Sequence, residues 1–223
     1  MFPDLTRDDV FRLETKRLWL RWPRASDSAA VTAFASLPEV AQMTANIPHP
    51  YPAKEADRFI FRARAENAEG KALHLAITRK SAVRPVFGLV SAIANGESEV
   101  EIGYALAPEM WGKGYATEAV RMMIDTVFAL TPVLRILANS RVNNPASRRV
   151  LEKAGFAFLD TGLDWLGARG GMHPCDRFRL ERADWRHSAK LRPLPPMAHQ
   201  RRDEADAILA APVADRTGEL HDY

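Results

Sequence analysis

One segment governs how this chain can fold and what it can bind: Trp111-Gly112-Lys113-Gly114-Tyr115-Ala116-Thr117-Glu118-Ala119. It follows a strand-like run over residues 100–106 and begins an amphipathic helix that we expect to span 115–130. Glycine has no Cβ, so the two glycines let the backbone approach a ligand closely. The helix directs its free N–H groups and the positive end of its dipole at the same loop. The segment therefore predicts an anion site suited to phosphate.

Three kinds of turn compete for this loop. A P-loop requires G-x-x-x-x-G-K-[ST], whereas Lys113 lies between the glycines and Tyr115 follows the second one. A dinucleotide fingerprint requires a third glycine where Thr117 stands, and no early βαβ unit precedes this segment. A plain strand-to-helix turn would be the better explanation of an isolated Gly-x-Gly, but other segments of the chain agree with a binding loop.

Three further segments stand with the loop: Glu14-Thr15-Lys16-Arg17-Leu18-Trp19-Leu20-Arg21, Glu101-Ile102-Gly103-Tyr104, and Asn144-Pro145-Ala146-Ser147-Arg148-Arg149-Val150-Leu151-Glu152-Lys153-Ala154-Gly155-Phe156. Taken together and in this order, the four segments resemble the GNAT superfamily of N-acetyltransferases, and within it the Rim-type branch that acetylates the N-termini of ribosomal proteins. The resemblance covers Glu14 to about Arg182. The superfamily's loop is often written [RQ]-x-x-G-x-[GA]. Gly114 and Ala116 match it, and a Trp in place of Arg or Gln, here Trp111, is usual in the Rim-type branch.

The resemblance implies a fold and a cofactor. The fold is α/β, a GNAT-type mixed and mostly antiparallel sheet flanked by helices, with a C-terminal tail. The co-substrate is acetyl-CoA, no metal is required, and the six histidines form no convincing ligand cluster. Lys113 either adds a charge at the phosphates or is a solvated loop lysine, and Tyr115 is expected to pack rather than to catalyse. The residues expected to contact acetyl-CoA are Leu106, Trp111, Gly112, Lys113, Gly114, Tyr115, Ala116, Thr117, Asn144 and Ser147.

Acetyl transfer to an amine needs a base for the amine's proton and a hydrogen-bond donor for the leaving thiolate. Glu101 is the first candidate for the base, because in the family its strand flanks the acetyl group. Ile102 and Tyr104 should alternate onto the opposite face of that strand. Glu99 shares the face of Glu101 and is the alternative base. The competing interpretation is that Glu101 is a half-exposed strand residue without a catalytic role.

Ser147 is, by resemblance to the Rim-type branch, the candidate that protonates the thiolate. Asn144 matches the family's cofactor-contacting asparagine. Both also fit a purely structural interpretation, in which Asn143 or Asn144 caps the helix and the hydroxyl of Ser147 is satisfied locally. Many members of the superfamily place a tyrosine acid just before the Glu-Lys-x-Gly-Phe segment. Leu151 stands at that position here, which favours Ser147.

The expected acceptor is a primary amine, either a protein N-terminus or a small amine such as an aminoglycoside or a polyamine. In the family, the loop that joins the first two helices shapes the acceptor pocket. Here that loop holds Thr44, Asn46 and His49, and a lone His49 among prolines is more typical of a surface residue. A non-catalytic acyl-CoA-binding module is the alternative outside the enzymes. Cys175 is expected to be a small buried residue rather than a nucleophile.

Length and composition bound the remaining expectations. With 223 residues, 47% of them hydrophobic, the chain should form one domain over 1–185, followed by a Pro-rich linker and tail over 186–223. No apolar run approaches a membrane span, and the N-terminus lacks the features of a secretory signal. The single cysteine fits a reducing, cytoplasmic setting. A formal net charge of +3 is too small and too scattered to indicate nucleic acid.

Hydrophobic periodicity predicts the order of the elements. Strands are expected at 18–22, 73–78, 86–94, 99–106, 135–142, 156–160 and 177–180, and helices at 28–36 (capped by Asp27), 54–67, 115–130 and 145–154. Asn95-Gly96 predicts a hairpin turn. In the tail, 201–211 could form a short helix. Its apolar stripe would stay unpacked, or dock on its own domain or on a partner subunit in a homodimer.

Overall fold

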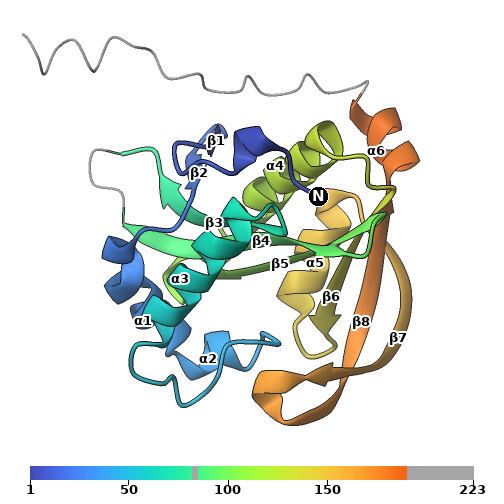
Figure 1. The fold of residues 1–223 in the computed structure, drawn as a ribbon. Coiled ribbons are helices and arrows are strands. Elements are labelled where there is room, and N and C mark those ends of the chain that lie inside the picture. The colour runs from blue at the N-terminus through green and yellow to red at the C-terminus, as the bar shows by residue number, and fades with distance from the viewer. Residues whose placement is uncertain (82–84, 190–223) are drawn as a thin grey trace, which may run out of the picture.

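The computed structural model describes residues 1–81 and 85–189, and in these two ranges the chain forms one eight-stranded sheet with the order β1-β2-β3-β4-β5-β6-β8-β7 (Figure 1). Neighbouring strands run antiparallel except β5 and β6, which are parallel. The strands are β1 (Arg12–Glu14), β2 (Leu18–Arg21), β3 (Ala72–Arg79), β4 (Val86–Asn95), β5 (Glu99–Leu106), β6 (Arg135–Arg141), β7 (Ala157–Leu166) and β8 (Gly171–Glu181). The expected mixed, mostly antiparallel sheet is confirmed.

Helices flank this sheet, and α1 and α3 lie side by side in Figure 1. The helices are α1 (Ser28–Ala35), α2 (Pro38–Ala41), α3 (Glu55–Ala68), α4 (Tyr115–Leu130), α5 (Pro145–Ala154) and α6 (Arg182–Ala189). The bounds of α4 and α5 agree with the periodicity of the sequence. The amphipathic pattern of α4 buries Ala119, Val120, Met123 and Val127, whereas Ala116 is only half-buried because it faces a cleft.

β5 and β6 pair over a short distance and then separate. Their register joins Glu99, Val100 and Glu101 of β5 to residues 135–137 of β6. Beyond Glu101, β5 continues to Leu106 on its β4 side alone, while β6 stays paired with β8. The separation opens the sheet between two strands near its middle. A ligand can enter there and meet backbone and side chains from both strands.

The alternation of side chains along β5 divides this opening into two faces. Tyr104 contacts Ser147 of α5. Gly103 pairs with Ser91 of β4, which in turn lies opposite His74 of β3, and the ring of His74 packs edge-on against Phe59 of α3. Successive residues of a strand point to opposite faces. The face of β5 that carries Tyr104 therefore faces the start of α5, and the face that carries Gly103 belongs to the side of the sheet on which α3 packs against β3. This agrees with the prediction that Ile102 and Tyr104 lie on the face opposite Glu101.

Two predictions about local structure need correction. Strands predicted at 156–160 and 177–180 are the ends of a much longer hairpin, β7 with β8, which curves away from the rest of the sheet in Figure 1. Asp27 stands before α1 but makes no side-chain cap there. Its carboxylate instead pairs with the Arg21 guanidinium at 2.8 Å and accepts the Arg24 N–H at 2.7 Å, because a buried carboxylate is best satisfied by a cation. The Asn95-Gly96 turn is confirmed: Gly96 has φ +74° between β4 and β5.

The predicted boundary after residue 185 falls inside α6, which extends to Ala189. Within α6, the indole of Trp185 donates to Asp125 of α4 at 2.8 Å and stacks near Phe128, with ring centroids 5.2 Å apart. The predicted Pro-rich linker and the short helix at 201–211 lie outside the described residues. Among the helices of the described ranges, none is both long and apolar enough to cross a membrane.

Candidate active site

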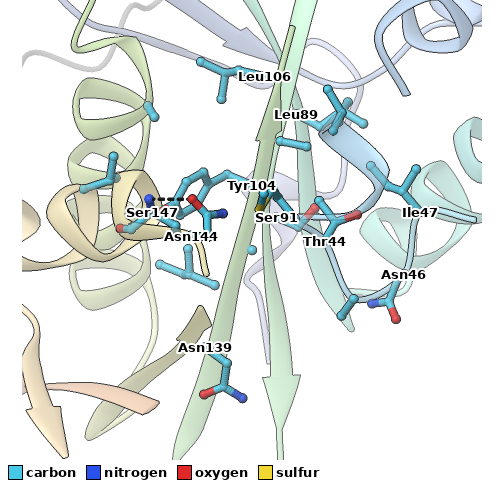
Figure 2. A pocket seen from close by; sticks show the side chains of 18 of the residues that line it. Thr44, Asn46, Ile47, Leu89, Ser91, Tyr104, Leu106, Asn139, Asn144 and Ser147 are labelled. Atoms are coloured by element: carbon cyan, nitrogen blue, oxygen red, sulfur yellow. Dashed lines mark hydrogen bonds between the residues drawn. The ribbon is translucent and has the colours of Figure 1, made fainter. Parts of the chain in front are cut away.

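A cleft of about 1550 Å³ opens where β5 and β6 separate. Its lining comes from both faces of β5, from the start of α4, from the start of α5 and from the loop after α2. Figure 2 shows Asn144 and Ser147 on one side of β5 and Thr44, Asn46 and Ile47 on the other. The cleft therefore brings together segments that lie far apart in the sequence.

The glycine loop borders this cleft in the conformation that the sequence predicts. Gly112 and Gly114 have φ angles of +72° and +77°, which side chains other than that of glycine rarely tolerate. A Cβ built on Gly112 would meet no atom within 4 Å, and one on Gly114 would lie 3.5 Å from an Arg17 nitrogen. The space beside both glycines is therefore open for a ligand. Glu118 is the first residue of α4 whose N–H bonds to a backbone carbonyl, that of Gly114 at 3.1 Å, so the preceding helical N–H groups have no partner within the helix.

Arg17 and Glu118 fix this loop against the start of β2. The Arg17 Nε donates to Glu118 Oε2 at 2.6 Å, and its Nη1 donates to the Lys113 carbonyl at 2.9 Å. Glu118 Oε1 also accepts from the Thr15 hydroxyl at 2.6 Å and from the Arg17 N–H at 2.8 Å. Burial alone would raise the pKa of Glu118, but these hydrogen bonds overcome it and lower the pKa. The carboxylate is thus held ionised as the centre of the loop's support.

Trp111, Leu106 and Tyr115 shape the loop from within. The indole Nε1 of Trp111 donates to the Leu106 carbonyl at 2.8 Å, which ties the loop to the end of β5. Tyr115 packs on Phe87 with a centroid distance of 5.4 Å, and the Arg17 guanidinium lies 4.4 Å above its ring. These contacts agree with the packing role expected of Tyr115. Lys113 is exposed, whereas Ala116 and Thr117 line the cleft.

The beginning of α5 supplies a cap and a hydroxyl pair. Asn144 is the N-cap, and its Oδ1 accepts from the Ser147 N–H at 3.0 Å (Figure 2). The Tyr104 hydroxyl lies 2.9 Å from Ser147 Oγ and donates to the Ser147 carbonyl at 3.2 Å. Burial raises the pKa of Tyr104 to about 12, against the opposing effect of its bond to Ser147, so this hydroxyl keeps its proton at neutral pH. Leu151 is fully buried in the core and does not line the cleft.

Glu101 lines the cleft, and Glu99 does not. Glu99 forms an ion pair with Arg135 at 2.9 Å, so its charge is already compensated. Desolvation, and then the nearby charge of Asp164, raise the pKa of Glu101. Asp164 comes from β7; its Oδ1 accepts from Arg177, and its Oδ2 has no hydrogen-bond partner within the described ranges. A carboxylate with a raised pKa in a cleft is suited to accept a proton near neutral pH.

The loop after α2 forms the far wall of the cleft. Thr44 and Asn46 line it, whereas His49 is exposed outside it, as expected of a surface residue. The tip of the β7–β8 hairpin closes on this loop, where Ala168 N–H donates to the Ala45 carbonyl at 3.2 Å. Cys175 is buried and lines the cleft, and burial raises the pKa of its thiol, so it is a poor nucleophile at neutral pH.

Several residues of the site escape analysis of the sequence. Arg17 lies in a segment on which the family resemblance rests. Its ion pair with Glu118 joins residues 101 positions apart, so the sequence did not indicate that Arg17 supports the loop. Tyr104 was expected on the face opposite Glu101, and nothing in the sequence indicated its bond to Ser147. His74 and Ser91 read as ordinary positions of two strands. The regions that the structure describes hold no group of three or more His, Cys, Asp or Glu side chains arranged for a metal ion.

Comparisons with known proteins agree on one family. Residues 17–157 match the family model described as an acetyltransferase (GNAT) domain. The chain is 30% identical over 146 residues to the uncharacterized N-acetyltransferase YoaA of Bacillus subtilis, covering 65% of this chain and 81% of that protein.

Two solved structures share the fold. RimJ of Mycobacterium smegmatis, in complex with CoA-disulfide, superposes with a TM-score of 0.66 at 24% identity, over 78% of this chain and 90% of that one. Spermidine N-acetyltransferase of Vibrio cholerae, in complex with CoA and spermine, superposes with a TM-score of 0.64 at 18% identity, over 77% of this chain and 99% of that one. With the glycine loop, the separated strands and the family match in agreement, this chain belongs to the GNAT family of acetyltransferases.

Proposed function

We propose that this acetyltransferase moves an acetyl group from acetyl-CoA to a primary amine by direct attack in a ternary complex. The observation that carries this proposal is that one cleft contains the glycine loop, Glu101 and Ser147. A phosphate group at the loop and a reacting acyl group between Glu101 and Ser147 can then belong to one extended cofactor. The amine acceptor enters from the side of Thr44 and Asn46.

The loop would hold the phosphates of acetyl-CoA. The N–H groups of residues 112–117 and the positive end of the α4 dipole favour a pyrophosphate there. A second, smaller groove adjoins the loop, and basic residues outnumber acidic ones in its lining: Lys16, Arg17, Arg121 and Lys153 against Glu118 and Asp125. Its positive charge suits the remaining phosphate of CoA. Asn144 borders the opposite side of the cleft and, besides capping α5, can contact the acyl-bearing arm of the cofactor.

The transfer itself balances in two proton movements, one away from the amine nitrogen and one to the leaving sulfur. A neutral amine nitrogen attacks the thioester carbon, and the nitrogen of the resulting tetrahedral intermediate loses a proton to the Glu101 carboxylate. The C–S bond then breaks, and its electron pair leaves on sulfur. Ser147 donates its hydroxyl proton to this thiolate, while the Tyr104 hydroxyl, which keeps its own proton, donates a hydrogen bond to Ser147 Oγ. Glu101 gives the proton from nitrogen to solvent, and solvent returns one to Ser147, so no group is left changed.

The acceptor class has two candidates. A protein N-terminus is favoured by the resemblance to the Rim-type branch and by the likeness in fold to RimJ. A small polyamine is favoured by the likeness in fold to spermidine N-acetyltransferase. A peptide N-terminus needs room for a chain that extends out of the cleft past the loop at 42–47, whereas a small amine needs none.

The test is release of free CoA thiol from acetyl-CoA in the presence of an amine panel. The panel contains peptides with free N-termini, the same peptides with blocked N-termini, and polyamines. Thiol release that requires a free amine, with a mass increase of one acetyl group on that amine, supports the proposal. Acetyl-CoA binding without thiol release for every member of the panel contradicts it.

A further inference from the structure

Glu66, His74 and Ser91 form a continuous hydrogen-bonded chain that ends in the cleft. His74 Nε2 lies 2.7 Å from Glu66 Oε2, and its Nδ1 lies 2.7 Å from Ser91 Oγ. The three residues come from α3, β3 and β4, and all three line the cleft. Ser91 appears among the lining side chains in Figure 2. A serine, a histidine and a carboxylate in line are an arrangement that moves protons in many active sites.

The direction of these hydrogen bonds follows from the chemistry of the groups. An ionised carboxylate can only accept, so Nε2 of His74 carries the hydrogen that lies toward Glu66. Burial lowers the pKa of His74, outweighing the opposing effect of Glu66, so the ring is neutral at pH 7. In a neutral ring the other nitrogen is an acceptor, and the Ser91 hydroxyl therefore donates to Nδ1. The lone pairs of Ser91 Oγ stay available to a donor from the cleft.

The backbone around the ring is fixed firmly enough to keep this arrangement. The Asn67 side chain donates to the His74 carbonyl at 3.0 Å and accepts the His74 N–H at 2.7 Å. The ring of Phe59 packs edge-on against the imidazole at a centroid distance of 6.1 Å. Apart from Glu66, the charged group whose field reaches the ring is Arg62, also from α3.

The space beside Ser91 is empty of side chains because its cross-strand partner is Gly103. A Cβ built on Gly103 would meet no atom within 4 Å. Glu101, two residues away on β5, shares this face and is a diagonal neighbour of Ser91, at a typical separation of about 7–8 Å. A nitrogen with a hydrogen bond to each side fits between them. The open space, the hydroxyl and the carboxylate thus surround one position in the cleft.

We propose that Ser91, His74 and Glu66 are a proton relay that deprotonates the incoming ammonium group of the acceptor before it attacks. This inference rests on the proposed function. The ammonium gives one proton to Ser91 Oγ while the hydroxyl proton of Ser91 passes to His74 Nδ1. His74 then gives its Nε2 proton to Glu66, whose partly exposed side chain passes it to solvent.

The relay and Glu101 therefore act on different protons. An alkylammonium acceptor loses two protons during the transfer, one before attack and one from the tetrahedral intermediate. The thiolate takes up one, so the net reaction releases one proton to solvent. The relay handles the proton lost before attack, and Glu101 handles the second. Ser91 contacts the acceptor, whereas His74 and Glu66 act through it as positioning residues.

The decisive kinetic experiment compares Ser91→Ala with wild type across pH, using one amine acceptor. Below the pKa of the amine, the variant should lose about 10²-fold in kcat/KM for the acceptor. Above that pKa the amine arrives neutral, and the ratio of the wild-type kcat/KM to that of the variant should approach unity. Glu66→Gln should follow the same pattern more weakly, and Ser91→Thr, which keeps the hydroxyl, should recover the wild-type profile. A ratio for Ser91→Ala that stays constant with pH would show a merely structural role and overturn the relay.

A second measurement does not depend on turnover. Nitrogen-15 NMR of the full chain, with the His74 signals assigned through His74→Gln, should show a protonated Nε2 and an unprotonated Nδ1. The opposite tautomer would overturn the relay even if the enzyme were active. Absence of turnover by wild type with every amine would instead contradict the proposed function, while the tautomer still decides the direction of the hydrogen bonds.

Discussion

The Tyr104 hydroxyl on β5 lies 2.9 Å from Ser147 Oγ on α5, and this contact joins the two sides of the opened sheet. It occurs three residues beyond Glu101, the last residue of β5 that pairs with β6. There the helix start takes the place of the missing neighbouring strand. The contact places a partly buried, protonated hydroxyl behind the serine that we propose as the donor to the thiolate.

Tyr104→Phe tests this contact. Removing a hydrogen bond of this kind should cost about 1 kcal/mol, or roughly a fivefold fall in kcat, with little change in the KM for acetyl-CoA. The measurement is steady-state kinetics, combined with Ser147→Ala and the double variant. If Tyr104 acts through Ser147, the two effects should not add, because the second substitution removes a bond that is already lost. Additive effects would assign Tyr104 an independent role.

The glycine loop gives a prediction about binding. Gly114→Val introduces a side chain at φ +77°, beside the Arg17 guanidinium that supports the loop, and should abolish the stabilisation by acetyl-CoA. For wild type, ligand at ~100 times its dissociation constant should add about 2.7 kcal/mol to the free energy of unfolding. The matched control is Gly96→Val, which carries similar backbone strain at φ +74° in the turn between β4 and β5 and does not itself line the cleft. Gly96→Val should lower the melting temperature yet keep the ligand-induced shift. A full shift in Gly114→Val would refute the assignment of the loop.

Local sequence was sufficient to predict the loop, α4 and α5, because each of these depends on neighbouring residues: two glycines, a 3.6-residue stripe and an Asn-Pro cap. The separation of β5 from β6 was not predictable, since Glu101 and Gly103 belong to one continuous strand pattern and only pairing shows where β6 departs. The same holds for the Tyr104–Ser147 contact and for the relay, whose members meet through three different elements. The β7–β8 hairpin was underestimated because Gly162 and Pro174 interrupt its pattern, and both residues disfavour strands in general.

Glu101→Gln addresses the base. The variant keeps the size of the side chain and removes its basicity, so kcat should fall by roughly 10²–10⁴ with acetyl-CoA affinity nearly unchanged. Glu99→Gln is the matched control: Glu99 lies two residues away on the same strand, paired with Arg135 outside the cleft, and its variant should keep wild-type kcat. A near-normal kcat for Glu101→Gln would show that Glu101 is not the base. A larger loss of kcat in Glu99→Gln than in Glu101→Gln would assign that role to Glu99.

Asp164→Asn should move the pH profile in a defined direction. Desolvation and the charge of Asp164 both raise the pKa of Glu101, so removal of that charge should lower it. The acidic limb of the kcat profile, where the base becomes protonated, should shift to lower pH. The same raised pKa means that Glu101 favours the folded state below its unfolded pKa, and that this contribution is lost as the pH rises through the folded pKa. An unchanged or upward-shifted acidic limb in Asp164→Asn would show that Asp164 does not act on the base.

Glu118 gives the opposite dependence of stability on pH. The pKa of Glu118 is lowered in the folded state. Its contribution to the free energy of unfolding is therefore present above the unfolded-state pKa, near 4.5, and is lost as the pH falls through the folded-state pKa. Glu118→Gln should therefore be less stable than wild type at pH 7, and the difference should shrink in acid. Urea unfolding of both proteins at pH 7 and in acid measures this difference in the free energy of unfolding. A difference that is the same at pH 7 and in acid would show that the charge of Glu118 is not what holds Arg17 and the loop.

The end of the described chain yields the last prediction. Arg182 of α6 donates to the carbonyls of Phe128 and Val133 at 2.7 and 2.6 Å, and Trp185 bonds to Asp125, so α6 satisfies groups at and beyond the end of α4. Each hydrogen bond from a charged group contributes about 1.5–3 kcal/mol. A chain ending after Glu181 should thus melt several degrees below one ending after Ala189, at about 2–4 °C for each kcal/mol.

The two truncated chains test α6 alone, because both lack residues 190–223. Trp185→Phe keeps the ring and loses the indole N–H, so it should account for about 1 kcal/mol of the difference. Equal melting temperatures for the two truncated chains would contradict the role of α6. Comparison of the chain ending after Ala189 with the full chain then isolates residues 190–223. If activity, melting temperature and mass in solution are all unchanged by their removal, docking of the tail on its own domain or on a partner subunit is wrong, since either contact would alter at least one of the three.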